Sequence, residues 1–276
     1  MPSDAVIQNN PDQPTNDQPT VGLVLGAGGT LGGSWIRGAL DGLEAVAGFR
    51  PAQATVIQGT SIGAFITGRL GGSEPLPADV FDALGRVATV PEPPSIRDRL
   101  VHGARLGAGA LVAAAAVTGR DDPRDWVQEV APDAAGRVVS MRSLPPRRRV
   151  AGLAAADDPT AEIAASGAVP FVARPVRFDG RRHCDGAAWS LTNADLVGPG
   201  DVDLLVVIAP RVTSDGGSAT SWTGRHQLRV ELAPWATANR PCIVVAPTSE
   251  EFERRNDRDR HHDDARARVE RLAAGA

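Results

Sequence analysis

The chain has 276 residues, of which 42% are hydrophobic, and its formal net charge is −4 at pH 7. This length and apolar fraction predict one large α/β domain with a substantial core, and the acidic balance argues against nucleic acid as a partner. No stretch reaches the length of a membrane span, and two cysteines, Cys184 and Cys242, are expected to be free thiols of a reducing compartment. We therefore expect a cytoplasmic protein.

The N-terminal segment differs in composition from the rest of the chain. Residues 1–20 are rich in Asp, Asn, Gln and Pro, which predicts disorder. They also lack the charged and then apolar stretch of a secretory signal. The expected organisation is a disordered segment at 1–20 followed by a single domain at 21–276.

A compact apolar strand is predicted at 21–25, and the glycine-rich run 26–33 follows at once. Apolar residues then recur at helical spacing from Trp35 to Val46. A glycine-rich turn between a strand and a helix exposes consecutive backbone N–H groups to an anion. That anion could be the pyrophosphate of a dinucleotide or the oxyanion of a tetrahedral acyl intermediate.

The dinucleotide interpretation requires G-x-G-x-x-G and an acidic residue at the end of the second strand. Gly26 and Gly28 are followed at the third position by Leu31, and the second predicted strand ends in Gln58-Gly59-Thr60-Ser61 without an acid. The fingerprint is therefore incomplete. A non-catalytic nucleotide-binding module that uses the glycine-rich run remains the alternative from a different functional class.

The second predicted strand leads into Gly59-Thr60-Ser61-Ile62-Gly63. The apolar, β-branched run 54–57 precedes this motif and a predicted helix at 64–70 follows it. Strand, G-x-S-x-G and helix together describe a nucleophile elbow, a tight turn that exposes a serine oxygen at the edge of a sheet. Glycines are needed beside Ser61 because side chains would collide at the turn. If the two strands are adjacent and parallel, the glycine-rich run lies beside Ser61.

The middle of the chain is predicted to be helical. Ser95 and Asp98 have the form of a capping box that opens a helix. Residues 104–118 form a small-residue apolar stretch, too short to span a bilayer, that fits either a closely packed buried helix or a flap over the site. Asp121-Asp122-Pro123 is predicted to cap another helix, and Arg147-Arg148-Arg149 to begin a strand or to contact an anionic headgroup.

A serine nucleophile needs a partner that takes its proton, and the residues leave two candidates. An α/β-hydrolase would use a histidine late in the chain, and His226 is the one outside a heavily charged tail. Asp185 is the other candidate. It precedes Gly186 and follows the stretch 172–180, which is predicted to form a hairpin. Asp-Gly is also a common pair in turns without any catalytic role.

The C-terminal third adds two buried strands, at 202–208 and 242–245, typical of a sheet covered on both faces. Thr248 and Glu251 form another predicted capping box, and the tail to Ala276 is predicted to be a charged helix. His261 to Asp264 are ligand-type residues, but neighbours on a helix point in different directions, so a solvated face is favoured over a metal site.

Taken together, these motifs resemble the patatin-like phospholipase family. The resemblance extends over about residues 21 to 210 and includes 164–171 and Asn193-Ala194-Asp195 around the Asp-Gly-Ala turn. It implies a three-layer α/β/α fold with a mostly parallel central sheet. It also implies a Ser–Asp dyad without histidine, in which Ser61 is the nucleophile and Asp185 its base. The implied oxyanion hole is formed by Gly26, Ala27, Gly28, Gly29 and Thr30. The implied elbow and turn glycines are Gly59, Gly63 and Gly186.

The resemblance implies a lipid acyl hydrolase of the phospholipase A or esterase type, working through an acyl-enzyme without metal or cofactor. Its partner would be a lipid or acyl-ester substrate reached by transient contact with a membrane surface. The chain departs from the family's loop pattern, which has three glycines, then any residue, then a basic residue and a further glycine. Here Ala27 lies inside the loop and Leu31 stands at the basic position, so ester hydrolysis is a firmer expectation than phospholipid specificity.

Overall fold

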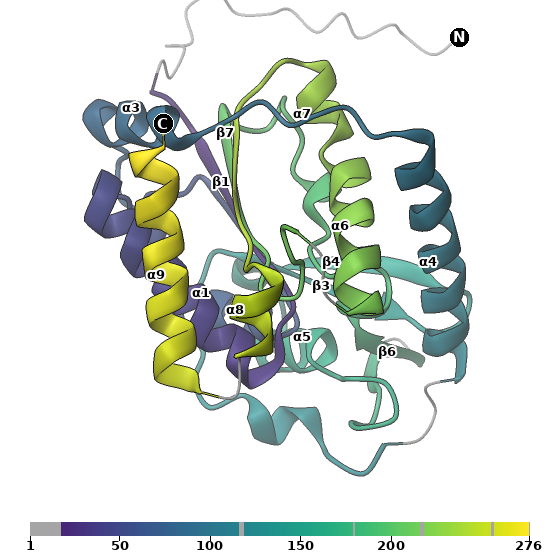
Figure 1. Ribbon diagram of the computed structural model, residues 1–276. Coiled ribbons are helices and arrows are strands. Elements are labelled where there is room, and N and C mark those ends of the chain that lie inside the picture. The colour runs from purple at the N-terminus through teal and green to yellow at the C-terminus, as the bar shows by residue number, and fades with distance from the viewer. Residues whose placement is uncertain (1–17, 116–118, 179, 216–217, 255–256, 276) are drawn as a thin grey trace, which may run out of the picture.

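The computed structural model describes residues 18–115, 119–178, 180–215, 218–254 and 257–275 (Figure 1). Nearly all of the segment expected to be disordered, 1–20, lies outside these ranges, and so do residues 116–118 of the predicted stretch 104–118. None of the helices within the described ranges is both long and apolar enough to cross a membrane.

A mixed sheet with a mostly parallel centre forms the middle of the molecule. Its strand order is β5-β6-β3-β2-β1-β7-β8, with β4 paired to β3 off this path. The parallel strands are β1 (Val21–Leu25), β2 (Val56–Thr60), β3 (Arg137–Arg142), β7 (Leu204–Ile208) and β8 (Cys242–Val245). An antiparallel extension is made by β4 (Arg147–Gly152), β5 (Val176–Phe178) and β6 (Arg181–Asp185). The fold class is therefore the one expected from the sequence.

Helices cover both faces of the sheet (Figure 1). They are α1 (Gly29–Ala47), α2 (Ile62–Thr67), α3 (Ala78–Val87), α4 (Ile96–Ala115), α5 (Pro159–Ser166), α6 (Ala219–Glu231), α7 (Ala233–Thr237), α8 (Ser249–Glu253) and α9 (Arg258–Ala274). Short 3-10 turns lie at Pro51–Gln53, Pro123–Trp126, Leu153–Ala155, Gly186–Ala188 and Ala194–Leu196.

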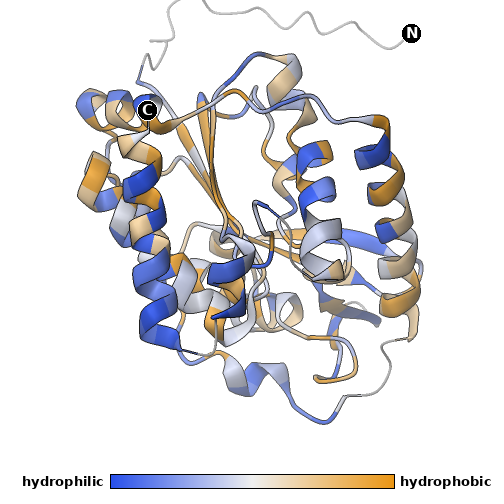
Figure 2. Cartoon of the chain, in the orientation of Figure 1, coloured by the Kyte–Doolittle hydropathy of each residue, from blue (hydrophilic) through white to orange (hydrophobic). Residues whose placement is uncertain are grey.

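The side chains of β1 show why the sheet lies between two layers. Leu23 and Leu25 point into the core shared with α1, α3 and α9, whereas Val24 belongs to a second core beneath α6 and α7. Because successive side chains of a strand point to opposite faces, a run of apolar residues can fill both cores. Figure 2 shows this as hydrophobic colour along the central strands and hydrophilic colour along much of α9.

Several sequence-based expectations need correction. The second strand begins at Val56 rather than Ala54. The expected helix after Asp122 is only the 3-10 turn Pro123–Trp126, although Asp122 does accept a hydrogen bond from the Arg124 N–H. The stretch 104–115 belongs to α4 but is not a buried helix, since Gly109 and Ala113 are its only buried residues. This helix lies on the surface because it packs on one side only.

Other expectations are confirmed. Ser95 and Asp98 form a reciprocal capping box, in which each residue's N–H donates to the other's side chain. The same arrangement joins Thr248 and Glu251 at α8. A hairpin does form here, but it is made by β5 and β6 over 176–185 and not by the stretch 172–180 alone. Cys184 and Cys242 are buried free thiols.

Candidate active site

Ser61 occupies a sharp turn between β2 and α2. Its backbone has φ 57° and ψ −124°, and it is one of few non-glycine residues with positive φ among those described. Such a conformation is strained for a residue with a Cβ and is found at functional sites. Ser61 is 7% exposed, so little of its surface is open to solvent. The strand, turn and helix together have the geometry of a nucleophile elbow.

The glycines that flank Ser61 are required by close backbone approach. A Cβ at Gly63 would lie 2.0 Å from the Leu25 carbonyl oxygen, and one at Gly59 would lie 2.4 Å from the Gly63 carbonyl oxygen. Both distances are far inside van der Waals contact with atoms that cannot move aside. The turn therefore brings α2 against the end of β1, which a larger residue at either position would prevent.

Asp185 ends β6, where it pairs in register with Ser140 of β3. Its side chain is 3% exposed, and its Oδ1 accepts a hydrogen bond of 2.8 Å from the Ala187 N–H. Burial raises the pKa of Asp185 to about 6, although hydrogen bonds from the Ala187 N–H and from the Ser61 side chain act in the opposite direction. The fold thus brings the Ser61 and Asp185 side chains together from distant parts of the chain.

Gly186 explains how Asp185 reaches this position. A Cβ at Gly186 would lie 2.3 Å from the Val139 carbonyl oxygen and 3.3 Å from Cγ2 of Thr60. The turn after Asp185 therefore packs directly against β3 and against the last residue before the serine. The Asp-Gly pair therefore forms a turn and also joins the end of β6 to the ends of β2 and β3.

The glycine-rich run lies beside the elbow, because β1 and β2 are parallel neighbours with Leu25 opposite Gly59. The N–H groups of Gly26 and Ala27 already donate to backbone carbonyls, at 2.9 and 2.7 Å. They hold the loop in place and are not open oxyanion donors. Helix α1 begins at Gly29, with Gly28 as its N-cap, so the first turn of the helix includes Thr30. First-turn N–H groups have no acceptor within the helix, which leaves Gly28, Gly29 and Thr30 as the open donors.

Ser166, at the end of α5, supports Ser61 and was not singled out from the sequence. The Ser61 N–H donates to its Oγ at 3.0 Å, and that Oγ donates in turn to the Val139 carbonyl oxygen at 2.7 Å. Ser166 is fully buried. These bonds fasten the strained turn to β3 and α5, which fixes the direction of the Ser61 side chain.

A polar network braces the loop that follows Asp185. The Asn193 side chain donates to Thr60 Oγ1 at 3.2 Å, and Gln58 Nε2 donates to the Asn193 carbonyl oxygen at 2.8 Å. From the other side, Glu231 of α6 accepts from Thr192 Oγ1 at 2.6 Å. Gln58 had a signal in the sequence, since it is a large polar side chain that directly follows the apolar residues of the strand. Glu231 had none, because its partners come from a distant loop.

His226 lies elsewhere, in the interface between α4 and α6. Its Nδ1 is 2.5 Å from Oδ1 of Asp98, and its ring meets Trp222 edge to face at 4.5 Å. The Ser61 side chain instead acts on Asp185, where it opposes the rise in pKa that burial causes. The geometry therefore favours the aspartate over the histidine as proton acceptor.

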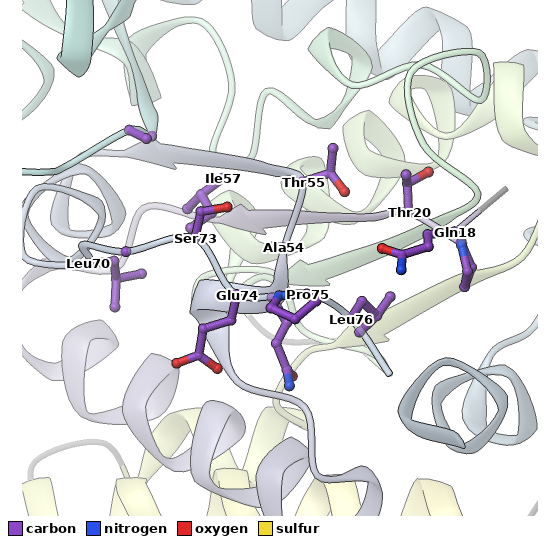
Figure 3. Close-up of a pocket in the computed structure, with 15 residues that line it drawn as sticks. Gln18, Thr20, Ala54, Thr55, Ile57, Leu70, Ser73, Glu74, Pro75 and Leu76 are labelled. Atoms are coloured by element: carbon purple, nitrogen blue, oxygen red, sulfur yellow. The ribbon is translucent and has the colours of Figure 1, made fainter. Parts of the chain in front are cut away.

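One cavity of the molecule lies away from Ser61. The cavity in Figure 3, of about 320 Å³, is lined by residues such as Thr20, Thr55 and Gly136. These residues precede β1, β2 and β3, whereas Ser61 follows β2. Five-residue strands rise about 16 Å, so this cavity lies at the opposite edge of the sheet from the serine.

Comparisons with known proteins give limited similarity. No protein-family profile matches the chain, and no curated protein matches it. Among solved structures, the chain is similar to VipD from Legionella pneumophila, with a TM-score of 0.42 and 11% sequence identity, over 94% of this chain and 67% of that one.

Proposed function

We propose that the chain is a serine acyl hydrolase of the patatin-like type, which cleaves fatty-acyl esters through a Ser–Asp dyad. One observation carries the proposal. Ser61, in a strained turn at the end of a parallel strand, lies beside a buried aspartate whose pKa burial raises to about 6. A base is most effective when its pKa lies near the working pH, and burial brings Asp185 much closer to that range than an exposed aspartate.

The proposed reaction has two steps. Ser61 Oγ attacks the ester carbonyl while Asp185 takes its proton, which is then passed to the departing alcohol. Water next attacks the acyl-enzyme, again with Asp185 as base, and releases the fatty acid. The N–H groups of Gly28, Gly29 and Thr30 would stabilise the negative oxygen of each tetrahedral intermediate, helped by the positive ends of α1 and α2.

Exposed apolar side chains of α4, the helix that packs against the turn after Asp185, support an acyl substrate and transient contact with a membrane surface. Gly109 of α4 packs so tightly that a Cβ there would lie 1.8 Å from the Ala188 carbonyl oxygen, three residues after Asp185. The outer surface of the same helix exposes Leu100 at 70% and Leu111 at 74%. Large exposed apolar side chains that gather on one surface are typical of interaction sites.

The experiment that tests this proposal is covalent labelling with a fluorophosphonate, followed by intact-mass measurement. We expect one adduct on the wild-type protein and none on Ser61→Ala or Asp185→Ala. The same variants should lose hydrolysis of a soluble fatty-acyl ester. His226→Ala is the matched control, and a folded His226→Ala protein that takes no label would favour a histidine-dependent esterase instead.

A further inference from the structure

A basic cavity lies on the antiparallel extension of the sheet, close to Asp185. Its volume is about 350 Å³, and its lining is Arg142, Arg147, Arg148, Arg149, Val150, Phe178, Arg181 and His183. His183 pairs with Arg142 in register and is two residues before Asp185 on β6. Side chains two residues apart on a strand point to the same face, about 7 Å apart. The cavity therefore opens on the face of β6 that carries the proposed base.

Three of these arginines pair with none of the carboxylates that the structure describes. Among the residues that the structure describes, Arg142, Arg147 and Arg181 form no ion pair, whereas Arg148 pairs with Asp195 and Arg149 with Glu162. The chain as a whole is acidic, with a formal net charge of −4. An accumulation of positive charge at one place is therefore a local feature and not a consequence of composition.

The strand register makes this accumulation unfavourable unless an anion is bound. Arg142 of β3 lies directly opposite Arg147 of β4 in an antiparallel pair. Like charges in directly opposite positions repel and destabilise a sheet. Arg181, opposite Phe178 in the neighbouring hairpin, adds a third charge on the same face. A bound anion would convert this repulsion into attraction.

One wall of the cavity is already held in position. The Arg149 guanidinium lies over the Phe178 ring at 5.0 Å and donates to Glu162 through Nε at 3.1 Å. The Phe178 ring in turn meets His183 edge to face at 5.2 Å. Guanidinium groups present paired N–H donors that match the oxygens of a phosphate, and several of them around one cavity suit a doubly charged group.

We propose that this cavity, which we call the arginine pocket, binds the phosphate group of a phosphorylated ligand, and that this ligand is the anionic headgroup of the substrate lipid. The second half of the statement rests on the proposed hydrolase function, but the first does not. The substrate class that follows is an anionic phospholipid. Its headgroup would bind between Arg142, Arg147 and Arg181 while an acyl ester reaches Ser61.

The test compares two double variants that remove the same number of charges. Arg142→Gln with Arg147→Gln alters the arginine pocket, and Arg37→Gln with Arg86→Gln alters two exposed arginines of α1 and α3. Binding is measured in a Ser61→Ala background by sedimentation with phosphatidylcholine vesicles, with and without phosphatidic acid. Binding of glycerol 3-phosphate is measured in parallel by calorimetry.

We expect the pocket variant to lose affinity for phosphatidic acid vesicles by about tenfold or more, and the control variant to change little. Loss of glycerol 3-phosphate binding alone would support a phosphate site but overturn the lipid headgroup as its ligand. Equal behaviour of the two variants in both assays would overturn the pocket itself. The thermal midpoint of the pocket variant should be unchanged or higher, because a like-charge pair is removed.

Different results would refute the hydrolase function and the arginine pocket. With Ser61 present, the pocket variant should hydrolyse a neutral soluble ester at the wild-type rate but phosphatidic acid more slowly. A wild-type protein that takes no fluorophosphonate label would overturn the hydrolase function, and vesicle binding would still decide the arginine pocket.

Discussion

Two buried aspartates of this protein have opposite properties. Asp98 is 1% exposed and Asp185 is 3% exposed. Burial acts to raise the pKa of Asp98, but hydrogen bonds from Ser95 and His226 and the charge of Arg229 outweigh it and lower the pKa to about 2. Asp185 has hydrogen bonds from one backbone N–H and from the Ser61 side chain, and burial raises its pKa to about 6.

The two aspartates differ in their partners as well as in how deeply they lie. Asp98 has two donors from Ser95, at 2.7 and 2.6 Å, and a histidine at 2.5 Å. Asp98 therefore anchors α4 to α6 and remains ionised down to low pH. Asp185 has the neutral Ser61 hydroxyl as its side-chain partner, where Asp98 has a histidine. Asp185 can therefore accept a proton nearer neutral pH. A buried acid is therefore a candidate base when its partners are few and neutral.

The largest expected effect is the loss of reaction at the dyad. Ser61→Ala and Asp185→Ala should each lower ester hydrolysis by at least about a thousandfold. Asp98→Asn should keep hydrolysis within a few-fold of wild type, since it touches the anchor and not the dyad. Steady-state kinetics on a soluble ester measures all three. Equal losses at Asp98 and Asp185 would remove the distinction between the two regions.

The second effect is on stability at the anchor. Asp98→Ala should lower the free energy of unfolding by about 3 kcal/mol or more, because it leaves His226 and Arg229 without their carboxylate. Urea unfolding at pH 7 measures this change. Asp98→Asn is the control that keeps the capping hydrogen bonds, and it should cost less. A stability unchanged by Asp98→Ala would show that the pair is not an anchor.

The third effect is a pH dependence set by Asp185. A base works only when deprotonated, so the rate of fluorophosphonate labelling should fall as the pH drops through about 6 and level off above it. The wild-type rate is measured from pH 5 to pH 8, with circular dichroism as a check that the fold persists. A rate that is flat across pH 6 would exclude Asp185 as the base.

The smallest effect is a stability gain at the same residue. The folded-state pKa of Asp185 is raised above the ordinary value of 3.8, so the folded protein holds this proton more tightly than the unfolded chain does. Stability from this group is present below about pH 4 and is lost as the pH rises through about 6. Asp185→Asn should therefore raise the thermal midpoint by several degrees at pH 7.5 and by less at pH 4.5. A lower midpoint at both pH values would contradict this.

The sequence predicted the elements that local patterns determine. The apolar runs of β1 and β8, the two capping boxes and the glycines around Ser61 could be recognised because each depends on neighbours in the chain. The exposed surface of α4 could not, since its small apolar residues fit a buried helix equally well.

The site was only partly predictable for the same reason. Ser61 and Asp185 stood in recognisable turns, but the support from Ser166 and Glu231 depends on contacts between distant segments. Likewise, the glycine-rich run indicated an anion site, yet the hydrogen bonds that occupy the Gly26 and Ala27 N–H groups arise from the strand β7 and the loop at Leu191. Hydrogen bonds from distant segments therefore determine which N–H groups of the glycine-rich run remain available to an anion.

Asp185 of β6 pairs with Ser140 of β3, so the proposed hydrolysis depends on the register between these two strands. Because side chains alternate along a strand, a slip of β6 by one residue would replace Asp185 by Cys184 or by Gly186 beside Ser140. Burial, together with the Asp185 charge, raises the pKa of the Cys184 thiol to about 12, so it is no base at neutral pH. A single-residue insertion in the β5–β6 hairpin would therefore abolish the proposed activity, whereas a two-residue insertion would restore the face that the aspartate needs.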